Sequence, residues 1–97
     1  MSLGAHAWTR FAERYAVGDV IRVQVTRVLP YGAEVEVVGF AGVEGLIHVS
    51  ELSDRRGVDA HEIVSELDLV DARIAKIDAP RRRLGLSLRR PESNSER

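Results

Sequence analysis

The sequence contains no cysteine, and this absence removes several kinds of site at once. A disulfide framework, a cysteine-ligated zinc site and a thiol nucleophile all require this residue. Apolar runs are also short: none approaches the roughly 20 residues of a membrane-spanning helix, so we expect no membrane protein. The initial stretch MSLGAHAW lacks the basic start and apolar core of a secretory signal. Together these absences favour the reducing environment of the cytoplasm.

An excess of charge of one sign is also missing, because 14 Lys and Arg residues face 15 Asp and Glu residues. A uniformly basic nucleic-acid-binding surface is therefore excluded, and any such binding has to come from a local patch. One concentrated basic stretch lies near the C-terminus, with no acidic residue from position 81 to 90: it contains Arg81, Arg82, Arg83, Arg89 and Arg90. Such a cluster favours contact with phosphates, because neutralising them releases counterions.

The 97 residues leave room for one domain. Aromatic residues are few, and Trp8, Phe11 and Tyr15 follow one another at the spacing of a single helix face. This spacing predicts an amphipathic helix over residues 5–16 whose aromatic face docks on the rest of the domain. Stacking of Trp8 on a nucleic-acid base is the alternative, and it requires an exposed ring.

Alternation of apolar and polar residues predicts β-strands along most of the remaining chain. The predicted strands cover residues 19–29, 33–38, 44–48, 69–78 and 83–88. The alternation slips phase at Val28 and again at Ile77, and a slip in so long a first strand predicts a bulge or sharp bend, as in a small closed barrel. We expect a helical turn at residues 49–52 and a short helix at residues 60–67, with Asp59 as N-cap.

These elements predict an all-β fold: a five-stranded antiparallel OB-fold barrel with an N-terminal helix and a short helical insert between the third and fourth strands. The long gap between those two strands favours the OB-fold over a simple meander. We divide the chain into an N-terminal helix or linker at residues 1–16, the barrel domain at residues 17–90, and a polar, disordered tail at residues 91–97.

Three motifs stand in order along the barrel: VGDVIRVQVTRVLPYGAEVEV, EGLIHVSEL and IAKIDAPRRRLGLSL. Together they resemble the S1 RNA-binding domain, the repeated unit of bacterial ribosomal protein S1, over residues 16–89. The resemblance implies an OB-fold that binds single-stranded RNA on one face.

The resemblance assigns RNA contacts to Tyr31, His48 and Asp78, and to an arginine at the start of the fifth strand that is either Arg82 or Arg83. Strict alternation would place Tyr31 in the core, whereas a break in phase at the following glycine would turn it outward to stack on a base. A structural hydrogen bond is the alternative role for His48. Asp78 either contacts a 2′-OH or orients Arg82 or Arg83, or it simply starts a turn.

The chain departs from the family pattern at two positions. Glu34 stands where the family has its second aromatic residue, and a carboxylate cannot stack on a base and repels phosphate. Leu67 replaces the glycine that usually precedes the fourth strand. Two further residues are candidates for RNA contact: Gln24, expected to point outward on the first strand, and Phe40, which either lies on the rim of the binding face or caps the barrel end.

We expect no catalysis, cofactor or metal. No pocket or partner nucleophile accompanies the neighbouring Glu34 and Glu36. The spacing of His6, His48 and His61 matches no metal-ligand motif, and the glycine-rich GFAGVEG lacks the lysine of a phosphate-binding loop.

The function expected from the sequence is therefore sequence-tolerant binding of single-stranded RNA, such as mRNA, by one repeat of a longer ribonucleoprotein of translation. Its partners would be RNA, the small ribosomal subunit and neighbouring repeats. One alternative is a protein–protein or ribosome-docking module that has lost RNA binding, which Glu34 and the acidic residues 59–71 favour. Another is an accessory RNA-binding domain of an RNA-processing enzyme.

Overall fold

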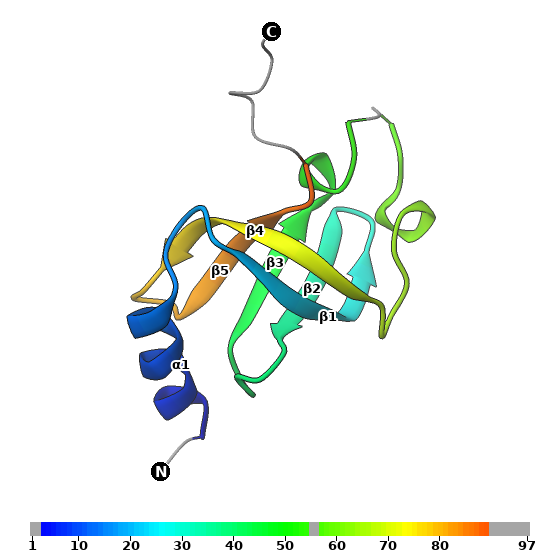
Figure 1. The fold of residues 1–97 in the computed structure, drawn as a ribbon. Helices are drawn as coiled ribbons and strands as arrows, with labels where there is room; N and C mark the ends of the chain where they lie inside the picture. Colours follow the sequence, from blue (N-terminus) through cyan, green and yellow to red (C-terminus); the bar gives the residue numbers. More distant parts are fainter. Residues whose placement is uncertain (1–2, 55–56, 90–97) are drawn as a thin grey trace, which may run out of the picture.

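The five predicted strands close into a barrel in the computed structural model, which describes residues 3–54 and 57–89 (Figure 1). The predicted tail at residues 91–97, and with it Arg90, lies outside the described residues. In chain order the elements are α1 (Leu3–Arg14), β1 (Val20–Leu29), β2 (Gly32–Val37), β3 (Glu44–His48), the 3₁₀ turns η1 (Val49–Glu51) and η2 (Ala60–Glu62), β4 (Leu69–Asp78) and β5 (Arg83–Ser87).

The strand order around the barrel is β1-β2-β3-β5-β4. Four of the neighbouring pairs are antiparallel, and β3 and β5 are parallel. The predicted all-β barrel is confirmed, with one correction to its antiparallel description. An odd number of strands cannot alternate in direction around a closed ring, so one neighbouring pair has to be parallel.

The two long strands, β1 and β4, each contain a register shift. The register of β1 shifts between Val25 and Arg27, and that of β4 shifts between Ile74 and Lys76. The bulge in β1 confirms the interpretation of the slipped alternation before Val28. The slip before Ile77 has the same cause, because one extra residue in a strand reverses which side chains face inward.

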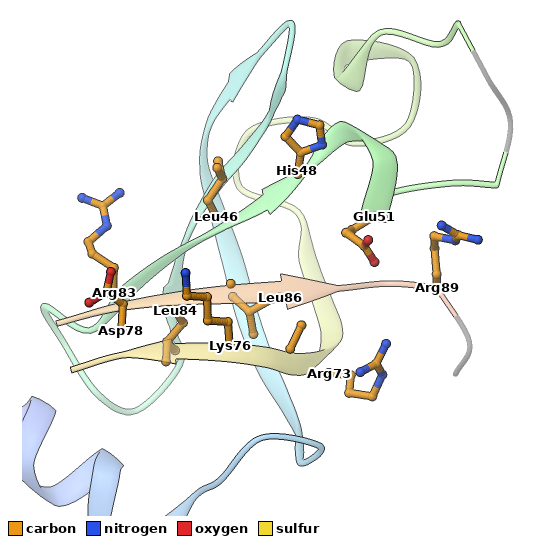
Figure 2. Close-up of a pocket in the computed structure, with 12 residues that line it drawn as sticks. Leu46, His48, Glu51, Arg73, Lys76, Asp78, Arg83, Leu84, Leu86 and Arg89 are labelled. Atoms are coloured by element: carbon orange, nitrogen blue, oxygen red, sulfur yellow. The ribbon is translucent and has the colours of Figure 1, made fainter. Parts of the chain in front are cut away.

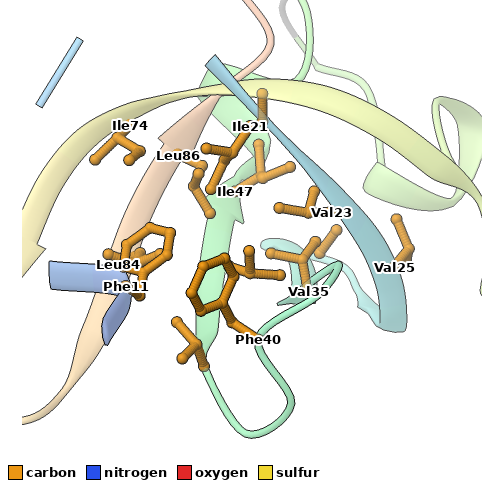
Figure 3. Close-up of a cluster of buried hydrophobic side chains, with 14 of the residues drawn as sticks. Phe11, Ile21, Val23, Val25, Val35, Phe40, Ile47, Ile74, Leu84 and Leu86 are labelled. Atoms are coloured by element: carbon orange, nitrogen blue, oxygen red, sulfur yellow. The ribbon is translucent and has the colours of Figure 1, made fainter. Parts of the chain in front are cut away.

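The barrel interior is filled by the inward side chains of all five strands (Figure 3). α1 covers one end of this core: Phe11 is fully buried, and its ring meets that of Phe40 edge to face at 5.4 Å. The predicted docking of the helix is confirmed, and Trp8, at 8% exposure, is too buried to stack on a base. Phe40 is 9% exposed, so it caps the barrel end and the rim interpretation is wrong.

The insert between β3 and β4 is less helical than predicted. The expected turn at residues 49–52 is present as η1, but the helix expected at residues 60–67 is only the single turn η2. Asp59 caps that turn by accepting a hydrogen bond from the His61 N–H at 2.9 Å. The chain then leaves the helical path because the Leu67 N–H donates to the Val25 carbonyl of β1 at 2.7 Å.

Candidate nucleic-acid interface

An open groove runs over β3, β5 and β4 on the outside of the barrel (Figure 2). Alternation explains its position, since Leu84 and Leu86 of β5 enter the core while Arg83 and Gly85 face outward. The residues that line the groove are Leu46, His48, Glu51, Arg73, Ala75, Lys76, Asp78, Arg83, Leu84, Gly85, Leu86 and Arg89.

Gly85 opens the middle of this groove. Its backbone lies between Leu46 of β3 and Lys76 of β4, which are its partners in the two adjoining ladders. A Cβ atom added at Gly85 would have Lys76 Cβ, at 3.4 Å, as its nearest neighbour. The missing side chain therefore leaves a gap with an apolar wall on one side and a lysine on the other.

The groove carries positive charge although the whole chain has a net charge of −1. Four basic residues line it, Arg73, Lys76, Arg83 and Arg89, against the two carboxylates of Glu51 and Asp78. Arg89 is held by Asp54, with Nε 2.6 Å from Oδ1, and by the Ser50 carbonyl. Within the described part of the chain, no ion pair involves Arg73, Lys76 or Arg83.

Both carboxylates of the groove have partners on the protein. Glu51 Oε1 accepts a hydrogen bond from the buried Ser87 hydroxyl at 2.6 Å. Asp78 accepts from the backbone N–H of Arg81 at 3.3 Å and from its guanidinium at 3.2 Å. These bonds, led by the one from the backbone, hold the pKa of Asp78 below its usual range. Asp78 thus starts the turn and bonds Arg81, and the predicted bond to Arg82 or Arg83 is wrong.

The structure separates the two arginines that the sequence left as alternatives. Arg82 lies in the β4–β5 turn with φ of 55°, outside the set of groove residues. Arg83 begins β5, is the ladder partner of Asp78, and lines the groove.

His48 makes the structural hydrogen bond that was its alternative role, and its ring also faces the groove. It lies at the end of β3, lines the groove and is exposed. Its Nδ1 lies 3.1 Å from the Ser50 backbone nitrogen and 2.8 Å from the Ser50 hydroxyl. A backbone N–H always donates, so Nδ1 is the acceptor and the proton of the neutral ring is on Nε2. The exposed ring therefore retains one hydrogen-bond donor, at Nε2.

Tyr31 points outward at the His48 end of the groove, as the break in phase allowed. The residue is 52% exposed, and its carbonyl accepts a hydrogen bond from the Val49 N–H at 2.7 Å. The next residue, Gly32, pairs with His48, and a Cβ there would lie 2.5 Å from the Ile47 carbonyl oxygen. Only glycine permits this close approach of the β1–β2 turn to β3, so Tyr31 adjoins the groove without lining it.

The remaining candidates lie at different distances from the groove. Glu34 is half-buried on β2 and pairs with Leu46, so it occupies the strand beside the groove. Gln24 lines a separate depression with Glu36 of β2, and its amide donates to the Leu67 carbonyl at 3.3 Å. Gln24 and Phe40 are thus not brought together with His48.

Sequence reasoning missed the contributions of Arg73, Lys76 and Gly85. Arg73 and Lys76 lie on the same outer face of β4 because the register shift between Ile74 and Lys76 resets the alternation. The slip in the alternation of this strand was visible in the sequence. Assigning the outward residues separately before and after the slip would have identified Arg73 and Lys76 as neighbours on the outer face.

Two other kinds of feature are absent from the described residues. They contain no group of three or more histidines and carboxylates placed to hold a metal ion. Among them there is also no helix long and apolar enough to span a bilayer.

Comparison with known families gives a match over residues 14–89 to the model described as the S1 RNA binding domain. Curated relatives are small ribosomal subunit proteins bS1. That of Mycolicibacterium smegmatis is 39% identical over 82 residues, which are 84% of this chain and 17% of the relative. The bS1 homolog of Bacillus subtilis is 33% identical over 85 residues, 88% of this chain and 22% of the relative. The chain thus spans about a fifth or less of these relatives.

Solved structures show the same fold. The a/eIF2alpha-aDim2p-rRNA complex from Pyrococcus horikoshii OT3 contains a chain that matches with a TM-score of 0.74 and 26% identity, covering 82% of this chain and 48% of that one. The solution structure of GSP13 from Bacillus subtilis matches with a TM-score of 0.72 and 28% identity, covering 87% and 66%.

Proposed function

Because the chain belongs to the S1 RNA-binding domain family, we propose that its groove over β3, β5 and β4 binds single-stranded RNA without catalysing a reaction. The observation that carries this proposal is the local reversal of charge. A chain with a net charge of −1 gathers four basic residues along an open groove whose carboxylates already have protein partners. Such a groove attracts the phosphates of a strand, and exposed rings beside it accept its bases.

In this proposal each site residue has a distinct role. Arg83 and Lys76 contact phosphates, Tyr31 stacks on a base, and the Nε2–H of His48 donates to a base or a 2′-OH. Arg82 adds charge from the turn, and Asp78 holds that turn in shape through Arg81. These contacts read few base edges, so binding tolerates many sequences.

We also propose that the chain acts as one repeat of a longer cytoplasmic translation protein that contacts mRNA and the small ribosomal subunit. The identity of 39% to a ribosomal protein of which the match covers 17% supports this role. Because Glu34 occupies one stacking position, the isolated domain should bind single-stranded RNA with a dissociation constant on the order of 10⁻⁴ M, near the limit of nonspecific binding. Tandem repeats would raise this affinity through effective concentration.

The experiment is a titration of the chain with single-stranded oligouridylate, followed by amide chemical shifts at about 50 and 200 mM salt. We expect shifts at residues 31–32, 48, 76 and 83–85 that weaken at the higher salt. The variant Arg83→Gln should bind more weakly. The matched control is Arg22→Gln, which removes the same charge from β1, where Arg22 pairs with Asp71 at 2.9 Å.

Absence of shifts at millimolar RNA would contradict the proposal. It would favour the alternative of a protein- or ribosome-docking module that keeps the fold. Equal loss of affinity in Arg83→Gln and Arg22→Gln would show that net charge, rather than the groove, attracts the RNA.

A further inference from the structure

Arg73 is the groove residue whose side chain has no explained role. It extends from β4 at the end of the groove near Glu51 and Arg89, away from Arg83 and Asp78 (Figure 2). Its Nε atom is buried and has no hydrogen-bond partner in the described part of the chain. Its neighbour Glu51 accepts from Ser87, at 2.6 Å.

A buried donor without a partner is uncommon in folded proteins, and one on a charged group is more costly than one on a neutral group. Three other arginines have carboxylate partners: Arg22 with Asp71, Arg81 with Asp78, and Arg89 with Asp54. Among the described residues Arg73 has no such partner, and neither has Arg83. Turning the Arg73 guanidinium toward an anion in the groove therefore breaks no hydrogen bond of its Nε and supplies the acceptor that this atom lacks.

Arg73 also lies at a useful distance from the other phosphate-binding candidates. Along β4 it is five positions from Asp78, the ladder partner of Arg83, which corresponds to about 16 Å at the rise of a strand. Lys76 and the gap at Gly85 lie between these two ends. The positive charge therefore runs along the whole groove rather than gathering at one end.

We propose that Arg73 is a further phosphate-binding residue, beyond Arg83 and Lys76, which takes the backbone of a nucleotide beyond the one at His48. The planar guanidinium can bind a phosphate through two parallel N–H donors, Nε and one terminal nitrogen. A bound strand then follows the groove from Arg83 to Arg73. This inference rests on the proposed function, since it extends the footprint of the RNA in the same groove.

The test compares Arg73→Gln with the wild-type chain on a uridine dinucleotide and on an oligouridylate of about eight nucleotides, within the site sizes of OB-folds. We expect the variant to bind the longer oligonucleotide about threefold to fivefold more weakly, as for loss of one exposed ion pair. The slope of log K against log salt should fall by about 0.7, which corresponds to one phosphate contact on a single strand. Binding of the dinucleotide, followed at the amides of residues 48 and 83, should not change.

Two further variants control for charge and geometry. Arg73→Lys keeps the charge but not the paired donors, and we expect an intermediate affinity for the longer oligonucleotide. Arg10→Gln removes one positive charge from the exposed side of α1 and should leave both affinities within error. Unfolding in urea establishes that each variant is folded at the titration conditions.

Two results would overturn the inference. One is an unchanged affinity of Arg73→Gln for the longer oligonucleotide, and the other is an equal loss for both ligands. In either case binding by the wild-type chain would leave the proposed function standing. If the wild-type chain binds neither ligand, the proposed function and this inference both fail.

Discussion

At the scale of single residues, Leu67 has a backbone conformation that does not suit its side chain. Its φ is 75°, and the residue is 72% exposed. The left-handed region costs a residue with a Cβ about 1–2 kcal/mol, and glycine avoids this cost at an entropic penalty of roughly 0.5–1 kcal/mol. We predict that Leu67→Gly raises the free energy of unfolding by about 0.5–1 kcal/mol, measured in urea.

Leu67→Ala separates backbone strain from the exposure of the leucine side chain, because alanine keeps the Cβ but removes the rest of that side chain. It should give no gain. A gain as large as that of Leu67→Gly would mean that the exposed leucine itself, rather than its backbone, lowers stability.

Glu34 is the residue at which the expected RNA face is least suited to RNA. It lies on the outer face of β2, opposite Leu46 of the groove. We predict that Glu34→Phe tightens binding of oligouridylate by about 1–3 kcal/mol, the contribution of one stacked base. Glu34→Gln removes only the charge and should tighten binding less. If titrations give the two variants the same affinity, no base reaches position 34.

At the scale of elements, the parallel pair β3 and β5 contains two glycines that differ in how much space a side chain would have. A Cβ at Gly45 would lie 2.7 Å from the Leu84 carbonyl oxygen and 2.8 Å from Leu86 Cδ1, whereas at Gly85 the nearest atom is 3.4 Å away. We predict that Gly45→Ala lowers the free energy of unfolding by about 1–3 kcal/mol through overpacking. Gly85→Ala should change it by less than about 0.5 kcal/mol.

A larger residue at Gly85 tests whether RNA occupies the groove. Gly85→Val should remain folded in urea titrations, because its side chain points into the gap beside Lys76, yet it should lower RNA affinity by filling that gap. Unchanged RNA affinity in a folded Gly85→Val chain would place the bound strand elsewhere on the barrel.

At the scale of the whole molecule, three aspartates on the surface couple folding to pH. Hydrogen bonds hold the pKa of each below its ordinary value of 3.8: the backbone N–H of His61 acts on Asp59, the side chain of Arg22 on Asp71, and the backbone N–H of Arg81 on Asp78. An aspartate whose pKa is lower in the folded than in the unfolded state stabilises the fold at any pH above its pKa in the unfolded chain, which is about 3.9. This stabilisation is lost as the pH falls through the pKa of the folded state.

We therefore predict that the free energy of unfolding falls as the pH drops below roughly 4. Urea midpoints measured from pH 7 downward check this, and carboxyl carbon shifts of the three aspartates should titrate below 3.8. Carboxyl titration midpoints at or above pH 3.8 would mean that these hydrogen bonds do not persist in solution.

The sequence by itself determined where the strands run and which alternating strand residues enter the core. Alternation is a property of neighbouring residues, so Val23, Val25 and Val35 could be assigned inward, and the slipped phase before Val28 already indicated a bulge. The aromatic spacing of α1 likewise predicted its buried face. The helix expected at residues 60–67 ends after one turn although Asp59 caps it, and the Leu67 N–H bonds the carbonyl of distant Val25 instead of continuing a helix.

Only the tertiary structure decided which outward residues meet. The closure order places β5 between β3 and β4, so Gly85 comes to lie between Leu46 and Lys76, which are far apart in the chain. It also separates Arg83 from Arg82 and brings Arg73 to the far end of the groove. The physical reason is that a strand pattern tells the inner face from the outer, whereas neighbours on the outer face depend on pairing between distant segments.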